Sequence, residues 1–159
     1  MIEERALVRF VFDEARALNE RRYGDWLAMF AAAGRYWVPL QGEAQSEGAL
    51  AASLADEDCV LLSIRIERLK NPHAWSMGSG VASLHVVQQP QVLESDDQAG
   101  AFQLSTPFTY VETKGDRQFL LAGTWKHRLV LEDGGLKIAL KRVDLVNPGA
   151  AHEAIHLFP

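Results

Sequence analysis

The chain has 159 residues, 48% of them apolar, which is enough to bury the core of one compact domain. Its 16 Lys and Arg residues stand against 21 Asp and Glu residues, so the formal net charge is −5. This apolar content excludes intrinsic disorder, and the acidic balance is unfavourable for binding the phosphate backbone of nucleic acids. We therefore expect a single domain over residues 1–159, with no nucleic-acid partner.

The cysteine content and the hydropathy pattern bear on the compartment. The one cysteine, Cys59, rules out an internal disulfide framework and a four-cysteine zinc site. No run of about 18 apolar residues is present, so no membrane-spanning helix is expected. Glu3 and Glu4 make the start of the chain too acidic for a signal peptide. These features predict a cytoplasmic protein with no membrane partner.

Helices are predicted mainly over residues 3–33 and 56–69. Before Gly34, a residue type that often ends a helix, apolar side chains recur twice at helical spacing. These side chains are Leu7, Val11, Ala15 and Leu18, and then Tyr23, Trp26, Leu27 and Phe30. Residues 35–40 are rich in strand-forming types, and residues 41–55 are small and polar, as in a loop. Residues 56–69 fit a strand almost as well, but a helix is preferred there.

An antiparallel sheet is predicted mainly over residues 81–147. Apolar and polar residues alternate there through three or four long runs, which is typical of strands with one buried face. Residues 114–117 and 133–135 contain the turn signals Gly-Asp and Asp-Gly between these runs. Helices first and a meander of strands afterwards predict an α+β fold, in which a curved sheet wraps on the N-terminal helices.

Residues 152–156, HEAIH, match the zinc-binding pattern H-E-x-x-H. On a helix, the two histidines would share one face, and the glutamate could act as a general base. Here the string follows Pro148 and Gly149, and no third ligand follows it in the sequence. If the segment is extended, the two histidines lie about 13 Å apart, which is too far to share an ion. We therefore predict no metal site in this chain.

A curved sheet that closes on helices can enclose a pocket, where a Tyr or His beside an Asp could transfer protons. The pocket candidates are Tyr36, His127 and Asp144, with His85 and Tyr110 as further ones. The sequence alone brings no two of them together, so ordinary roles in the sheet are preferred. A stand-alone isomerase or dehydratase that uses these residues is the alternative function, and a binding module with an open cavity is a third.

Residues 14–27 read EARALNERRYGDWL and residues 35–39 read RYWVP. The two blocks resemble the patterns E-A-R-L-L-D-E-R-R-x-x-x-W-L and R-Y-W-V-P of the small (beta) subunit of aromatic-ring-hydroxylating dioxygenases, the Rieske-type non-haem iron oxygenases. Weaker matches follow in the same order at residues 65–69, RIERL, and residues 136–139, LKIA. Asn19 stands where the family usually has Asp.

The resemblance implies a cone-shaped, cystatin-like α+β fold, shared with ketosteroid isomerase and scytalone dehydratase. It implies a structural small subunit that braces catalytic alpha subunits in a hexamer of three alpha and three beta subunits, self-associates as a trimer, and takes part in breaking down aromatic compounds. The Rieske [2Fe-2S] cluster and the mononuclear iron are expected in the alpha subunit. This chain, a subunit of an oxidoreductase, is expected to hold no cofactor and no catalytic residue, since one cysteine is too few for a Rieske centre.

A bracing subunit is expected to use large aromatic and arginine side chains in its core and at its contacts with neighbours. The residues predicted for these structural or interface roles are Trp26, Arg35, Tyr36, Trp37, Arg65, Arg68 and Trp75. The family's segment P-P-S-R-x-x-H is reduced here to residues 78–80, so subunit contacts around residues 78–85 are expected to differ.

Overall fold

The computed structural model describes residues 1–48, 50–70, 80–150, 152 and 154–159. Its helices are α1 (Glu4–Asn19), α2 (Tyr23–Ala28), the short 3-10 helix η1 (Gly42–Ala44) and α3 (Cys59–Lys70). Its strands are β1 (Phe30–Pro39), β2 (Ser53–Asp58), β3 (Val81–Val87), β4 (Gln91–Asp96), β5 (Ala101–Lys114), β6 (Arg117–Glu132) and β7 (Gly135–Leu145). None of the helices in these ranges is long and apolar enough to cross a membrane.

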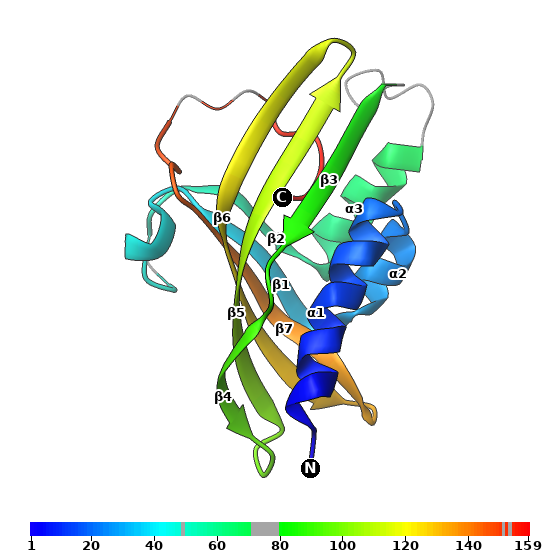
Figure 1. Cartoon of the computed structure of the whole chain (residues 1–159), viewed down its shortest axis with the longest axis vertical. Coiled ribbons are helices and arrows are strands. Elements are labelled where there is room, and N and C mark those ends of the chain that lie inside the picture. The colour runs from blue at the N-terminus through cyan, green and yellow to red at the C-terminus, as the bar shows by residue number, and fades with distance from the viewer. Residues whose placement is uncertain (49, 71–79, 151, 153) are drawn as a thin grey trace.

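The strands form one curved sheet that wraps around the three α-helices (Figure 1). The strand order is β2-β1-β7-β6-β5-β3, and β4 also pairs with β5. Neighbouring strands are antiparallel except β1 and β7, which are parallel. The result is a cone with the core between the concave face of the sheet and the helices. The predicted α+β cone is confirmed.

The strands β5, β6 and β7 form the predicted meander. Along β5 and β6, buried residues alternate with more exposed ones, because successive side chains point to opposite faces of a strand. At the turn between β6 and β7, Asp133 has a φ of 53° and Gly134 a φ of 78°. Two left-handed residues in a row are what a type I′ hairpin turn requires, so the turn predicted at residues 133–135 is confirmed.

Pro107, in the middle of β5, explains why β3 and β4 are separate strands. β3 pairs with residues 108–114 of β5, and β4 pairs with residues 101–105 of the same strand. The carbonyl oxygen of Pro107 accepts a hydrogen bond from the Gln88 backbone N–H, so this edge of Pro107 faces the β3–β4 junction. Since proline has no N–H to donate there, the ladder is interrupted at this point.

The helix predictions need two corrections. Residues 30–33 are not helical but open β1, where Phe30 pairs with Ile138 of β7, so pairing in the sheet overrides the helix propensity of three alanines. Residues 56–58 belong to β2, and the helix begins at Cys59, after Asp58. The Asp58 carboxylate accepts a hydrogen bond from the Leu61 backbone N–H and so caps α3. The sheet predicted over residues 81–147 therefore also includes β1 and β2.

The predicted apolar face of α1 is confirmed. Its residues Leu7, Val11, Ala15 and Leu18 are at most 5% exposed. Trp26 of α2 is fully buried, and its ring packs edge-on against Phe30 and Tyr36, with centroid distances of 5.2 and 5.8 Å. Aromatic side chains therefore fill the centre of the cone, where helices and sheet meet.

Gly123 of β6 lies close against the backbone of β7. A Cβ atom at this position would lie 2.2 Å from the carbonyl oxygen of Asp144, which is backbone and cannot swing away. We expect Gly123→Ala to lower the free energy of unfolding by about 1–3 kcal/mol, the usual range for overpacking. Urea denaturation followed by circular dichroism measures this change.

Gly135 supplies the matched control, because it begins β7 and a Cβ there would meet nothing within 4 Å. Gly135→Ala is expected to be neutral or slightly stabilising. Equal effects of the two substitutions would contradict the close approach of β6 and β7 at Gly123.

Candidate functional site

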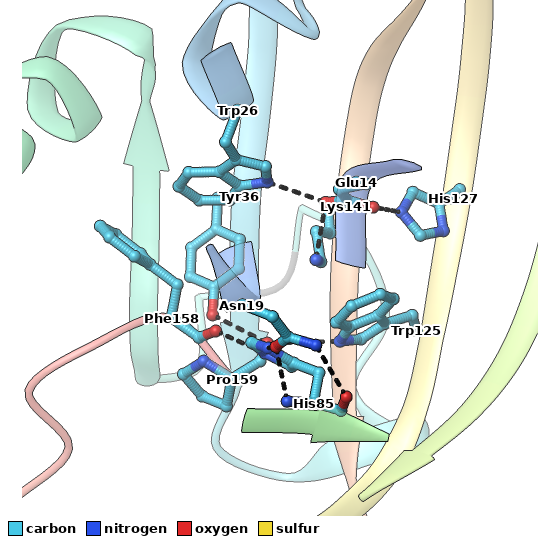
Figure 2. Close-up of polar contacts among 10 residues, drawn as sticks. All are labelled: Glu14, Asn19, Trp26, Tyr36, His85, Trp125, His127, Lys141, Phe158 and Pro159. Atoms are coloured by element: carbon cyan, nitrogen blue, oxygen red, sulfur yellow. Dashed lines mark hydrogen bonds and ion pairs between the residues drawn. The ribbon is translucent and has the colours of Figure 1, made fainter. Parts of the chain in front are cut away.

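The interior of the cone contains polar side chains among the aromatic ones, and Figure 2 shows them. Six elements contribute to it: the residues are Glu14 and Asn19 of α1, Trp26 of α2, Tyr36 of β1, His85 of β3, Trp125 and His127 of β6, and Lys141 of β7. Phe158 and Pro159, from the C-terminal segment, lie among them. We refer to this set as the cone interior.

Glu14 is the centre of a buried charged cluster. One carboxylate oxygen, Oε1, accepts hydrogen bonds from Trp26 Nε1 at 2.9 Å and from Lys141 Nζ at 2.7 Å. The other, Oε2, lies 2.6 Å from Nε2 of His127, which donates because a carboxylate can only accept. The side chains of Glu14, Lys141 and His127 are fully buried, so one carboxylate joins two helices to two strands away from solvent.

The charges in this cluster compensate one another. Burial alone would raise the pKa of Glu14, but the charges of Lys141 and His127 and their hydrogen bonds hold it well below its usual range. Burial also lowers the pKa of Lys141, and Glu14 opposes that shift. The ammonium of Lys141 lies 3.4 Å from the ring centroid of Trp125, where a cation–π contact replaces part of the lost hydration.

His85 and Asn19 form a second polar group, which ties α1 to β3. The Asn19 side chain donates to the carbonyl oxygen of His85 at 3.0 Å and accepts from its backbone N–H at 2.8 Å. Nε2 of the His85 ring lies 2.8 Å from the carbonyl oxygen of Phe158, so Nε2 carries the proton. Burial, together with the charge of Lys141, lowers the pKa of His85 to about 3, so the ring is neutral at neutral pH.

The C-terminal segment occupies the remaining space of the cone interior. The centroid of the Phe158 ring lies 4.6 Å from the centroid of the Trp26 ring, and the Phe158 residue is almost completely buried. The backbone oxygen of Pro159 accepts hydrogen bonds from Trp125 Nε1 at 3.3 Å and from the Tyr36 hydroxyl at 3.4 Å. The polar groups that a substrate would meet here are therefore bonded to the protein's own backbone.

Glu112 and Arg65 both bind this segment. The Glu112 carboxylate accepts from the backbone N–H groups of His156 at 3.1 Å and Leu157 at 2.9 Å, and from the Tyr110 hydroxyl at 2.7 Å. The Arg65 guanidinium donates to the Leu157 carbonyl oxygen at 2.6 Å and lies 4.2 Å from the centroid of the Phe158 ring. Charged groups thus fix the backbone just before the buried residues.

The pocket candidates Tyr36, His127 and Asp144 are not brought together. Tyr36 and His127 do face the cone interior, where each has a separate partner. Asp144 faces the other side of the sheet, where it pairs with Lys126 and Arg142. This correction follows from strand alternation: Asp144 pairs with Thr124 in register, one residue out of phase with the inward-facing positions.

The predicted structural and interface residues fall into three groups. Trp26, Tyr36 and Trp37 are at most 2% exposed: the first two lie in the core, and Trp37 is buried beneath Arg35 and Arg142. Arg35 forms an ion pair with Asp56 and lies over the Trp37 ring, and Arg65 binds the C-terminal segment, as above. Arg68 is exposed on α3, whereas Trp75 lies outside the described residues. The interface roles of these arginines stay predictions.

The described part of the H-E-x-x-H string, residues 152 and 154–156, lacks the helix that would bring its two histidines onto one face. The described residues around it, 152 and 154–159, are not helical, and the His156 backbone N–H is bonded to Glu112. Among the described residues, no group of three or more His, Cys, Asp or Glu side chains is placed to hold a metal. One cysteine also cannot supply the two thiolates of a Rieske cluster.

Sequence reasoning missed Glu14, Lys141 and Glu112 as organising residues. A signal for Glu14 exists, because it lies within the apolar face of α1, beside Val11 and Ala15, where a charge needs a buried partner. Two of its partners, His127 and Lys141, are more than 100 residues away in the sequence. Only the strand order brings them close to Glu14.

Glu14→Gln is expected to lower the free energy of unfolding by about 3–5 kcal/mol, the usual cost of leaving a buried charge unpaired. The neutral amide cannot compensate Lys141, and its own N–H₂ group would face groups that only donate. Glu4→Gln, an exposed change on the same helix, is the control, with an expected effect within about 0.5 kcal/mol. If denaturant titration gives the two variants equal stabilities, the cluster does not stabilise the fold.

The contribution of Glu14 should depend on pH in a defined direction. Its pKa in the folded protein is lower than the value of about 4.3 expected in the unfolded chain. A lowered carboxyl pKa adds stability above the unfolded value, and this stability is lost as the pH falls further. The stability gap between the wild type and Glu14→Gln should therefore narrow as the pH falls from about 5 to about 3. A constant gap over that range would contradict the assignment.

Comparison with known proteins places this fold in a family. The family profile described as "Ring hydroxylating beta subunit" matches residues 13–149. Subunit beta of benzene 1,2-dioxygenase from Pseudomonas putida is 22% identical over 129 residues, which are 76% of this chain and 68% of that protein.

Solved structures share the fold over nearly the whole chain. The beta subunit of benzoate 1,2-dioxygenase from Burkholderia mallei superimposes with a TM-score of 0.73 at 18% identity, over 92% of this chain and 93% of that one. A chain of naphthalene 1,2-dioxygenase with indole in its active site gives a TM-score of 0.80 at 15% identity, over 99% of this chain and 88% of that one. Since the profile match covers well over half of the sequence, this chain belongs to the family of ring-hydroxylating beta subunits.

Proposed function

We propose that this chain is the non-catalytic small subunit of an aromatic-ring dioxygenase and that it braces catalytic alpha subunits. The observation that carries the proposal is the family match over residues 13–149. The benzene, benzoate and naphthalene dioxygenases named above indicate the class of enzyme. The alpha subunit would select and oxidise the aromatic substrate. It would also bind the Rieske cluster and the mononuclear iron.

The filled cone interior supports a bracing role over the alternative isomerase or dehydratase. An enzyme of that kind needs a proton-transferring group that meets its substrate. Here the Tyr36 hydroxyl and the His85 ring are bonded to the backbone of Pro159 and Phe158, and Asp144 is on the opposite face of the sheet. A rigid, filled cone is suited to holding other subunits in place.

An apolar row on the outer face of the sheet supports assembly. Leu84 of β3 pairs with Val111 of β5, which pairs with Leu120 of β6, and Val86 is the next outward-facing residue of β3. Leu84, Val86 and Leu120 are 52%, 60% and 61% exposed. Exposed apolar side chains that are cross-strand neighbours are typical of protein interfaces. We call Leu84, Val86, Val111 and Leu120 the outer apolar row.

The proposed assembly is a hexamer of three alpha and three beta subunits in the cytoplasm, with a trimer of this chain as its base. Closed symmetry of this kind lets each small subunit use the same surface. The single half-buried cysteine is compatible with a reducing compartment.

Leu120→Asp tests the role of the outer apolar row. When the chain is co-expressed with its alpha subunit, the wild type should sediment as a hexamer. The substitution should shift the distribution to smaller species, because a buried carboxylate without a partner is costly at an interface. Sedimentation velocity over a range of concentrations measures the shift.

Leu93→Asp is the matched control. Leu93 is 57% exposed on β4, which pairs with the other end of β5, at residues 101–105. The Leu93→Asp substitution should leave the hexamer intact. Both variants should keep the wild-type melting temperature. A Leu120→Asp protein that assembles like the wild type would exclude this surface, whereas a wild-type chain that stays monomeric with its alpha subunit would overturn the proposed function.

A further inference from the structure

The residues Phe158 and Pro159 lie in the cone as a small ligand would. An aromatic ring fills the apolar part, and two backbone oxygens accept hydrogen bonds from three different elements (Figure 2). Only side chains that are far apart in the sequence make these contacts. The same surroundings would receive a separate molecule of similar shape and polarity if the segment moved out.

The ring of Phe158 occupies a space with aromatic walls and one cation. Trp26, Tyr23 and Tyr36 place their ring centroids 4.6, 5.7 and 6.0 Å from that of Phe158. The Arg65 guanidinium adds a cation–π contact at 4.2 Å. Such surroundings favour a planar aromatic ring over an aliphatic group of the same size.

The oxygen-binding part consists of neutral donors. His85 Nε2 donates to one backbone oxygen, while the Tyr36 hydroxyl and Trp125 Nε1 converge on the other. The His85 ring is neutral, and Lys141 is already compensated by Glu14. Three neutral donors therefore suit the oxygen acceptors of a ligand.

A pocket beside the segment supplies an approach from solvent. It has a volume of about 460 Å³ and is lined by Tyr36, Arg65 and Arg68 together with Leu157 and Pro159. This pocket and the cone interior thus share Tyr36 and Pro159. A ligand could enter next to the segment and replace it stepwise.

We propose that the cone is a binding site for small aromatic compounds that carry oxygen acceptors and that residues 155–159 compete with them for it. The site is independent of the bracing role, since the outer apolar row is on the other face of the sheet. The apparent affinity of a ligand is its intrinsic affinity reduced by the fraction of molecules in which the segment is released. Anything that loosens the segment therefore strengthens the binding of the ligand.

Glu112→Gln tests this competition, because Glu112 holds the backbone of His156 and Leu157 but not the ring or the two oxygens of the site. Acetophenone is the probe, and the indole N–H signal of Trp125 in NMR titrations reports its binding. Acetophenone should bind the Glu112→Gln protein at least about tenfold more tightly than the wild type, since charge-assisted hydrogen bonds to the segment are lost.

Glu94→Gln, an exposed change on β4, is the matched control and should bind acetophenone like the wild type. In the wild type itself, saturating acetophenone should speed hydrogen exchange at the amides of His156 and Leu157, and this measurement holds even if Glu112→Gln does not fold. Equal affinities of the three proteins, or unchanged exchange of these amides at saturation, would overturn the competition. Absence of saturable binding to both the wild type and a folded Glu112→Gln protein would show that Phe158 and Pro159 are ordinary core.

Discussion

The interior of this fold depends on one buried carboxylate, that of Glu14. Its two oxygens bind groups from α2, β6 and β7, while its own helix, α1, packs against β3. A buried charge is tolerated only where its partners are fixed, so this carboxylate specifies how the helices sit in the cone. Lys141 connects it to Trp125, and Trp125 in turn binds the backbone of Pro159.

The C-terminal segment links the architecture to function. It closes the cone from inside, through Phe158 among aromatic rings and through backbone oxygens bonded to Tyr36 and His85. The chain's own residues thereby fill the cone, which suits the proposed role of supporting other subunits. Only the last few residues of the segment make these contacts, and Glu112 and Arg65 hold them in place. The interior can therefore also be regarded as a binding site in which this segment competes with a ligand.

Local sequence patterns predicted the structural features that depend on residues close together in the chain. The buried face of α1, the alternation along β5 and β6 and the turn at residues 133–135 follow from helical period, strand period and turn chemistry. The strand at residues 30–33 was missed because its pairing with β7 is nonlocal. For the site, the candidates Tyr36 and His127 face the interior, but the partners of Glu14 and the position of the C-terminal segment depend on strand order, which no local pattern contains.

The central claim is that this chain supports catalysis without carrying its chemistry. The most direct measurement is native mass spectrometry of the complex purified with its alpha subunit, combined with iron analysis of the two subunits after separation. The account predicts equal numbers of the two subunits, all of the iron with the alpha subunit, and no oxidation of aromatic compounds by this chain alone. Stoichiometric iron on the separated chain, or ring oxidation without the alpha subunit, would contradict it.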